Sequence, residues 1–262
     1  MDLIIRHTRL KGRAGSWDIG INGDRIAALS EKITDTATLE MDAAGNLVMP
    51  TYVNGHIHLD KCFLQEKMRP NKDYTFGECL ELTWEHKARY TTEDILERAG
   101  RAVEEGILNG ATVFRAFADV DSYAKLRGLE GLLALRERWR GITRVKQLWQ
   151  HGVNVFSSQD DVADPFYPFG RNDQQEVVGY ICHTAHMAAP SEIEAAFDFV
   201  TYNAARALRL QDYGLEPGCK ADLNVLAAPT VREVLRLQQP PGCVIREGKV
   251  LARTILQREF VR

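Results

Sequence analysis

The two ends of the chain share a pattern of short apolar runs separated by turn-forming residues. Near the start, the runs 3–5, 17–21 and 25–29 have this character. Asn22-Gly23 precedes the last of them and is a strong hairpin signal, because both residues tolerate a positive φ angle. The pattern returns at 221–226 and 243–251. It predicts a β-rich unit to which both termini contribute.

The middle of the chain follows a helical period instead. Apolar residues recur four positions apart within 91–109, and Thr91 with Asp94 resembles the capping box that begins a helix. Further helices are predicted over 75–89, 123–139, 142–150, 173–187 and 191–207. Short β-prone runs are found at 47–57, 111–118 and 153–156. Strands that alternate with helices predict parallel βαβ units, so we expect an α/β fold here.

Composition and charge indicate an ordinary globular protein that remains in water. The chain has 262 residues, a length that is enough to bury a core. Its residues are 45% hydrophobic and 26% charged, as in ordinary globular proteins. Its formal net charge is only −3, with acidic and basic residues mixed along the chain, so no electrostatic footprint for nucleic acid is visible. Membrane and polyanion partners are equally unsupported.

Cysteine usage and the N-terminal sequence predict a cytoplasmic location. The five cysteines are odd in number, widely spaced and without a C-x-x-C pair, which argues against a disulfide framework or a thiolate zinc site. The N-terminal segment Met1–Arg6 is too short and too acidic at its start for a signal peptide. No apolar stretch approaches the length needed to span a membrane.

Two histidines define the first candidate site. His56 and His58 follow the apolar run 47–50 and are two positions apart. Side chains at i and i+2 of a strand leave on the same face, so the two imidazoles can point at one divalent metal ion. The alternative is that they only form a polar face of the strand. Spacing alone does not decide between these interpretations.

Carboxylates follow the β-prone run 153–156. Asp160, Asp161 and Asp164 come directly after it, where the loops of a parallel barrel carry catalytic groups. Asp160 and Asp161 point to opposite sides if the backbone is extended, so at most one of them is a natural metal ligand. Asp164-Pro165 is also typical of the start of a turn, and Phe166 of loop packing.

Five motifs together resemble the metal-dependent amidohydrolase superfamily, and within it cytosine deaminase and the related triazine-ring aminohydrolases. They cover most of the chain, and the Asp-Asp-x-x-Asp-Pro-aromatic-Tyr-Pro run is specific to the cytosine deaminase-like branch. The motifs are Pro50–Phe63 with its His-Ile-His, Gly141–Lys146 leading to Gly152–Val155, Asp160–Gly170, Asn203–Gly214 and Gly218–Val225.

The resemblance implies a (β/α)8 TIM-like barrel with a small β-sandwich formed by both chain termini. Residues 1–48 plus 213–262 would form the sandwich and 49–212 the barrel. His56, His58 and Asp160 would bind one divalent metal ion, zinc or iron. Asp160 would also transfer protons, and Asp161 and Phe166 would line the substrate side.

The implied reaction is hydrolytic deamination of a cyclic amidine or other small N-heterocycle. Water attacks a ring carbon bearing an exocyclic amine, and ammonia or an amine leaves. The chemistry is consistent with the donor set, since a metal lowers the pKa of its water towards ~7 and a neighbouring carboxylate takes the proton.

The chain departs from the family in length. The segment 49–212 is shorter than the about 250 residues of a complete barrel. Only three barrel strands are predicted, around His56, Val113 and Val155, so the barrel is expected to be incomplete. The strands without a counterpart would supply a third metal-binding histidine and the glutamate that shuttles protons. The second strand has Phe117 where the family has a histidine.

Three hypotheses follow from this gap. The chain is an active deaminase, whose open sheet a homo-oligomer would complete because unpaired strand edges seek partners. Alternatively, it is a non-catalytic, internally deleted remnant that binds metal or a partner without turnover. A third hypothesis is a deletion product of a gene for a full-length enzyme. His183 and His186, three apart on a predicted helix, are the remaining candidates for a missing ligand.

Overall fold

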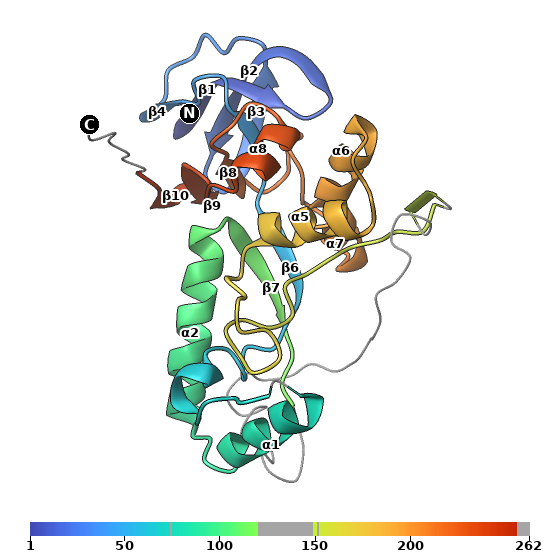
Figure 1. Ribbon diagram of the computed structural model, residues 1–262. Coiled ribbons are helices and arrows are strands. Elements are labelled where there is room, and N and C mark those ends of the chain that lie inside the picture. The colour runs from blue at the N-terminus through green and yellow to red at the C-terminus, as the bar shows by residue number, and fades with distance from the viewer. Residues whose placement is uncertain (74, 120–148, 151, 256–262) are drawn as a thin grey trace, which may run out of the picture.

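The computed structural model describes residues 1–73, 75–119, 149–150 and 152–255. The molecule is elongated, with one large sheet at one end and helix α1 at the other (Figure 1). The predicted helices over 123–139 and 142–150 lie outside the described residues, except for 149–150. No helix among those described is long and apolar enough to cross a membrane.

Both chain ends contribute to one eight-stranded mixed sheet. Its main path runs β10-β9-β8-β5-β1-β2-β3, with β4 paired to β1. The N-terminal and C-terminal strands meet where β5 pairs antiparallel with β8. The expected hairpin lies between β2 and β3, where Gly23 has a φ angle of 57°. The strands are β1 Leu3–Leu10, β2 Arg13–Asn22, β3 Arg25–Ser30, β4 Leu39–Asp42, β5 Leu47–Pro50, β8 Leu223–Val225, β9 Cys243–Arg246 and β10 Lys249–Arg253.

A second sheet consists of two parallel strands, β6 (Tyr52–Ile57) and β7 (Ala111–Ala116). Only Thr51 separates β6 from β5, so the chain passes directly from the large sheet into the histidine strand. Gly110, just before β7, has a φ angle of 90°, and a Cβ atom there would lie 2.5 Å from the Asn224 amide nitrogen. Glycine therefore allows β7 to start close against β8.

Helices cover these strands, and their starts follow the sequence. Thr75 and Thr91 each accept a backbone hydrogen bond three residues on, as N-caps do, and α2 begins where the Thr91–Asp94 pattern predicts. A turn of 3-10 helix, η1 (Leu64–Lys67), precedes them. The helices are α1 Phe76–Lys87, α2 Thr92–Leu108, α5 Gln174–Thr184, α6 Pro190–Asp198, α7 Tyr202–Ala207 and α8 Val231–Leu237.

The single helix predicted over 191–207 is wrong, because α6 and α7 are separate helices. The chain leaves helical geometry between them, with Thr201 at φ −127° and ψ −103°. The break leaves two carbonyls for other partners: that of Phe199 accepts from Ser157 N and that of Val200 from Val53 N, both at 3.0 Å. Tertiary contacts thus override the helical period.

The strand predicted over 153–156 is also wrong, so β6 and β7 are the only barrel-type strands among the described residues. Side chains take the hydrogen bonds that a neighbouring strand would provide: Asn203 Nδ2 donates to the carbonyl of Val155 at 2.8 Å. Asn154 Nδ2 in turn donates to the carbonyl of Asn203. Regular pairing is reduced to one parallel bridge, between Ile57 and Asp160.

Buried Arg98 attaches the loop after β6 to helix α2. Its Nη1 donates to the carbonyls of Asp60 and Cys62, each at 2.8 Å. Its Nε and Nη2 donate to Asp94 Oδ2, one turn earlier on the same helix, at 3.0 and 2.8 Å. All of these acceptors lose a partner if the guanidinium is removed.

We expect Arg98→Met to lower the free energy of unfolding by about 3 kcal/mol, since removing one partner of a buried charged group leaves the others uncompensated. Urea unfolding followed by circular dichroism measures this. Arg236→Met is the matched control, because Arg236 also pairs with a carboxylate of its own helix but is 63% exposed. Its loss should be within about 1 kcal/mol. Equal losses in the two variants would contradict the role given to Arg98.

Candidate metal centre

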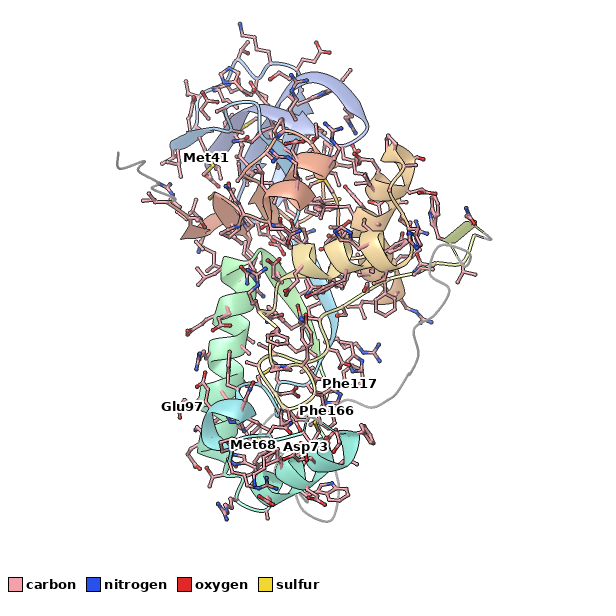
Figure 2. All side chains as sticks on the ribbon, viewed as in Figure 1. Met41, Met68, Asp73, Glu97, Phe117 and Phe166 are labelled. Carbon is pink, nitrogen blue, oxygen red and sulfur yellow. The ribbon has the colours of Figure 1, made fainter. Side chains whose placement is uncertain are left out.

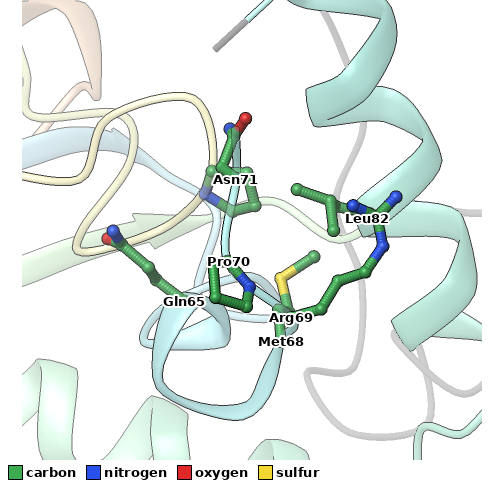
Figure 3. A pocket seen from close by; sticks show the side chains of 7 residues that line it. Gln65, Met68, Arg69, Pro70, Asn71 and Leu82 are labelled. Carbon is green, nitrogen blue, oxygen red and sulfur yellow. The ribbon is translucent and has the colours of Figure 1, made fainter. Parts of the chain in front are cut away.

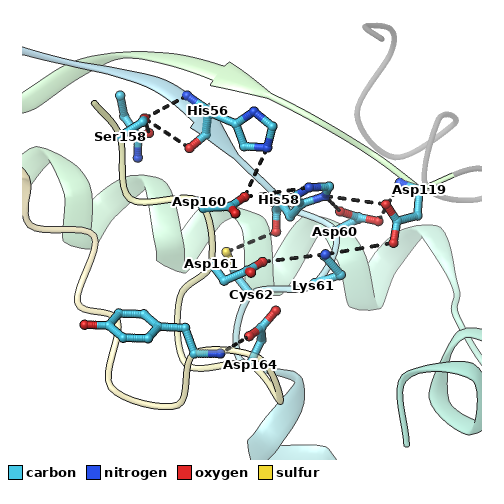
Figure 4. A network of polar contacts seen from close by, with 12 residues as sticks. His56, His58, Asp60, Lys61, Cys62, Asp119, Ser158, Asp160, Asp161 and Asp164 are labelled. Atoms are coloured by element: carbon cyan, nitrogen blue, oxygen red, sulfur yellow. Dashed lines mark hydrogen bonds and ion pairs between the residues drawn. The ribbon is translucent and has the colours of Figure 1, made fainter. Parts of the chain in front are cut away.

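His56, His58 and Asp160 converge at the end of β6 (Figure 4). Two backbone hydrogen bonds place the carboxylate there: His58 N donates to Asp160 O at 2.9 Å, and Asp160 N donates to His56 O at 3.0 Å. Asp160 Oδ1 lies 3.0 Å from His56 Nε2 and 3.8 Å from His58 Nε2. One ligand atom from each residue lies within 4.8 Å of the other two.

A chain of polar side chains holds the Asp160 segment against β6. Ser158 Oγ accepts a hydrogen bond from His56 N at 2.8 Å and donates to Asn54 Oδ1. Asn54 Nδ2 donates to Asn172 Oδ1, and Asn172 Nδ2 donates to the carbonyl of Ala102 in α2, both at 2.7 Å. Both asparagines are fully buried. The ligand-bearing segments are thus tied to each other and to α2.

The donor set is suitable for a divalent metal ion. Burial raises the pKa of Asp160, but the hydrogen bond and charge of His56 outweigh it, so the pKa lies below the ordinary value and the carboxylate is ionised at neutral pH. Two imidazoles and one carboxylate are a ligand combination that zinc and iron accept. Among the described residues no other group of three such side chains converges in this way, and His183 and His186 do not join it.

Asp161 and Phe166 lie beside this group. The Asp161 carboxylate is turned towards Lys61, with Oδ1 3.6 Å from Nζ. The ammonium of Lys61 in turn lies 5.2 Å from the centre of the Phe166 ring. Burial lowers the pKa of Lys61, but Asp161 and Asp119 raise it above its ordinary range, so the ammonium stays charged. No signal in the sequence marks Lys61 for a role, although it stands within the histidine motif.

Phe117 takes the place where the family resemblance expects an imidazole, and it contacts His56. The two rings are stacked, with centroids 3.9 Å apart and planes at 20°. Phe117 and Phe166 both lie towards the α1 end of the molecule (Figure 2). The stacking fixes the plane of the His56 ring but supplies no ligand atom. Spacing in the sequence gave no sign of this contact.

A cavity of about 220 Å³ is lined mainly by η1, the segment that follows it and α1 (Figure 3). It shares only Pro165 with the Asp160–Phe166 segment. Its lining residues are Gln65, Met68, Arg69, Pro70, Asn71, Leu82 and Pro165. The site therefore has to be located by its chemistry rather than by this cavity.

A parallel strand pair carries two histidines at its C-terminal end, and a later segment adds a carboxylate, which together form a donor set of the kind that metal-dependent hydrolases use. The chain belongs to the amidohydrolase family, whose model matches residues 91–252. It is similar to the N-isopropylammelide isopropyl amidohydrolase of Pseudomonas sp. (strain ADP), with 34% identity over 149 residues. That match covers 55% of this chain and 37% of the relative. The chain spans well under half the length of the curated relatives it matches.

Solved structures show the same fold. A 5-methylcytosine deaminase from Klebsiella pneumoniae, liganded with phosphonocytosine, has a TM-score of 0.83 at 19% identity and covers 98% of this chain and 100% of its own. An atrazine chlorohydrolase from Arthrobacter aurescens, complexed with zinc, has a TM-score of 0.72 at 14% identity and covers 96% and 95%. At these identities the similarity shows the fold alone.

Asp164 is a fully buried carboxyl group next to the site. Its Oδ1 accepts hydrogen bonds from the backbone of Phe166 at 2.9 Å and of Tyr167 at 2.8 Å, while its Oδ2 is buried without a hydrogen-bond partner. Burial, and then the negative charge of Asp161, raise the pKa of Asp164 to about 8. The neutral form is therefore favoured in the folded protein.

We expect Asp164→Asn to change the pH dependence of stability. A raised pKa means that the folded protein loses stability as pH rises from the ordinary value of 3.8 through about 8. Asparagine keeps the acceptor oxygen and never ionises, so the variant should gain roughly 2–5 kcal/mol over the native protein across this range. Urea unfolding at pH 5, 7 and 9 measures the difference. Parallel pH profiles would contradict the assignment.

Proposed function

We propose that this chain is a metal-dependent amidohydrolase of the cytosine deaminase type, which hydrolytically deaminates a cyclic amidine or related N-heterocycle. The observation that carries the proposal is the convergence of His56, His58 and Asp160 within 4.8 Å. Family membership and the names of the similar proteins support it, since these act on ammelide, cytosine and triazine rings.

In this proposal the site holds one divalent ion, zinc or iron. His56 and His58 would bind it through ring nitrogens, and Asp160 through a carboxylate oxygen. When bound, the ion lowers the pKa of water towards ~7 and polarises the ring carbon's substituent. The side chain of Asp160 is 57% exposed and ionised, so it is placed to accept a proton from water and return it to the leaving amine.

The substrate would lie between the metal ligands and the Phe166 ring. A planar heterocycle can stack on an aromatic face. The carboxylate of Asp161 accepts hydrogen bonds only, so it suits a ring N–H or an exocyclic amine. Charged Lys61, beside both residues, suits a ring carbonyl or ring nitrogen. The overall reaction consumes one water and releases ammonia or an amine, leaving a carbonyl on the ring.

Metal content and turnover test the proposal. We expect about one zinc or iron per chain, and release of ammonia from cytosine, creatinine or an amino-triazine, or of isopropylamine from N-isopropylammelide. His56→Ala removes a ligand and should weaken metal binding by more than the roughly 100-fold that losing an outer partner costs. His183→Ala, an exposed histidine on α5, is the control and should bind as the native protein does.

Two results would separate the hypotheses. Absence of both metal and turnover across the panel would sink the proposal. Bound metal without turnover would favour the non-catalytic alternative, in which the chain retains the site but not the reaction.

A second copy of the chain is proposed to complete the sheet. Among the described residues β7 pairs only with β6, so its other edge leaves backbone groups without a strand partner. Light scattering coupled to size exclusion should then show a dimer or larger assembly, whose dissociation on dilution lowers turnover. A monomer that is fully active at all concentrations would contradict this assembly.

A further inference from the structure

The Nδ1 atom of His58 faces carboxylates on the side away from Asp160. It is buried without a direct hydrogen-bond partner, and its nearest acidic atoms are Asp119 Oδ1 at 3.6 Å and Asp60 Oδ1 at 3.8 Å. The Nε2 atom faces Asp160 Oδ1. The two ring nitrogens therefore have distinct surroundings, one towards the proposed metal and one towards a pair of acids (Figure 4).

Asp119 is held in place at both its backbone and its side chain. Its backbone N–H donates to Asp60 Oδ2 at 3.0 Å. Its Oδ2 accepts from the Lys87 ammonium at 2.6 Å, and Lys87 is a buried residue of α1. Lys61 Nζ lies 3.9 Å from the same oxygen. These contacts leave Oδ1 of Asp119 facing His58.

Asp60 is engaged differently. It is fully buried, and the oxygen that has a partner receives the Asp119 backbone N–H. Its carboxylate thus positions the Asp119 backbone, and no lysine within the described part of the chain neutralises it at hydrogen-bond distance. The carboxylate of Asp119 is fixed by a charged partner, Lys87 of α1. Asp119 is therefore better placed than Asp60 to orient the imidazole.

We propose that Asp119, anchored by Lys87, is a positioning residue that holds His58 in the tautomer with the proton on Nδ1. A neutral imidazole has one N–H and one lone pair, and a carboxylate near Nδ1 favours the N–H there. The lone pair of Nε2 is then on the side of Asp160, where a metal ion would bind. At 3.6 Å the Asp119 oxygen is just beyond direct hydrogen-bond distance, and its negative charge favours the N–H on that side of the ring. The inference rests on the proposed metal site, and it links α1 to that site.

Three variants and two measurements test it. Long-range ¹H–¹⁵N spectra of ¹⁵N-histidine-labelled, metal-free protein report the tautomer of each imidazole, with His58 assigned through a His58→Gln variant. Competition with a chelator gives zinc affinity. The variants are Asp119→Asn, Lys87→Met and Asp60→Asn, with Lys11→Met as the control, because Lys11 also bonds an aspartate at 2.6 Å but far from the site.

The native protein should show His58 mainly as the Nδ1–H tautomer. Asp119→Asn should mix the two tautomers and weaken zinc binding about 10- to 100-fold, as losing an outer-sphere carboxylate does. Lys87→Met should give a smaller change in the same direction, and Lys11→Met none. If Asp119→Asn fails to fold, Lys87→Met alone has to show the tautomer shift.

Each failure has a distinct meaning. An unchanged His58 tautomer in a folded Asp119→Asn protein overturns the inference, and so does a zinc affinity within twofold of native. In either case the proposed function stands as long as the native protein binds zinc. A tautomer shift in Asp60→Asn but not in Asp119→Asn overturns it too. If the native protein binds no metal, the proposed function fails, and the metal-free spectra still decide the tautomer question.

Discussion

The site depends on the pairing of one short segment with one strand. The segment that carries Asp160 reaches β6 through two backbone hydrogen bonds, one accepted by the carbonyl of His56 and one donated by the N–H of His58. Ser158 and the buried Asn54 and Asn172 extend this pairing into the protein as a chain of side-chain hydrogen bonds. Backbone geometry therefore sets the separations of the three candidate ligands. Long flexible side chains contribute little to it.

The surroundings of the site are unusually charged for a buried region. Two lysines with little exposure, Lys61 and Lys87, lie among carboxylates that flank the histidines. Burying such charges without partners is costly, so their mutual pairing is a condition of folding as well as of chemistry. The charges that surround the candidate site therefore also determine the stability of this region. A substitution among these charges affects both.

Local signals in the sequence predicted much of the fold. The cap at Thr91 predicted the start of α2, and Asn22-Gly23 predicted a hairpin, because each depends on neighbours within four residues. The strand over 153–156 and the unbroken helix over 191–207 were wrong, because side chains and carbonyls distant in sequence compete there for the backbone. A hydrophobic pattern carries no information about such competitors.

The candidate site divides in the same way. Spacing suggested His56 with His58, position after an apolar run suggested the three carboxylates Asp160, Asp161 and Asp164, and only the family resemblance selected Asp160 among them. The stacking of Phe117 on His56, and the approach of Asp119 and Lys87 to His58, join residues that no motif links. Those contacts follow only from the pairing of β7 with β6 and from the reach of Lys87 in α1 to Asp119. Sequence patterns therefore pointed to the candidate ligands but not to the residues that hold them in place.

The break between α6 and α7 has a mechanical consequence. The carbonyls of Phe199 and Val200 hold Ser157 and Val53, which stand a few residues before Asp160 and His56 respectively. Phe199 and Val200, which are adjacent and fully buried, are thus a common anchor for the two segments that carry the candidate ligands. A displacement of that anchor would therefore move the two segments together and keep their direct hydrogen bonds to each other.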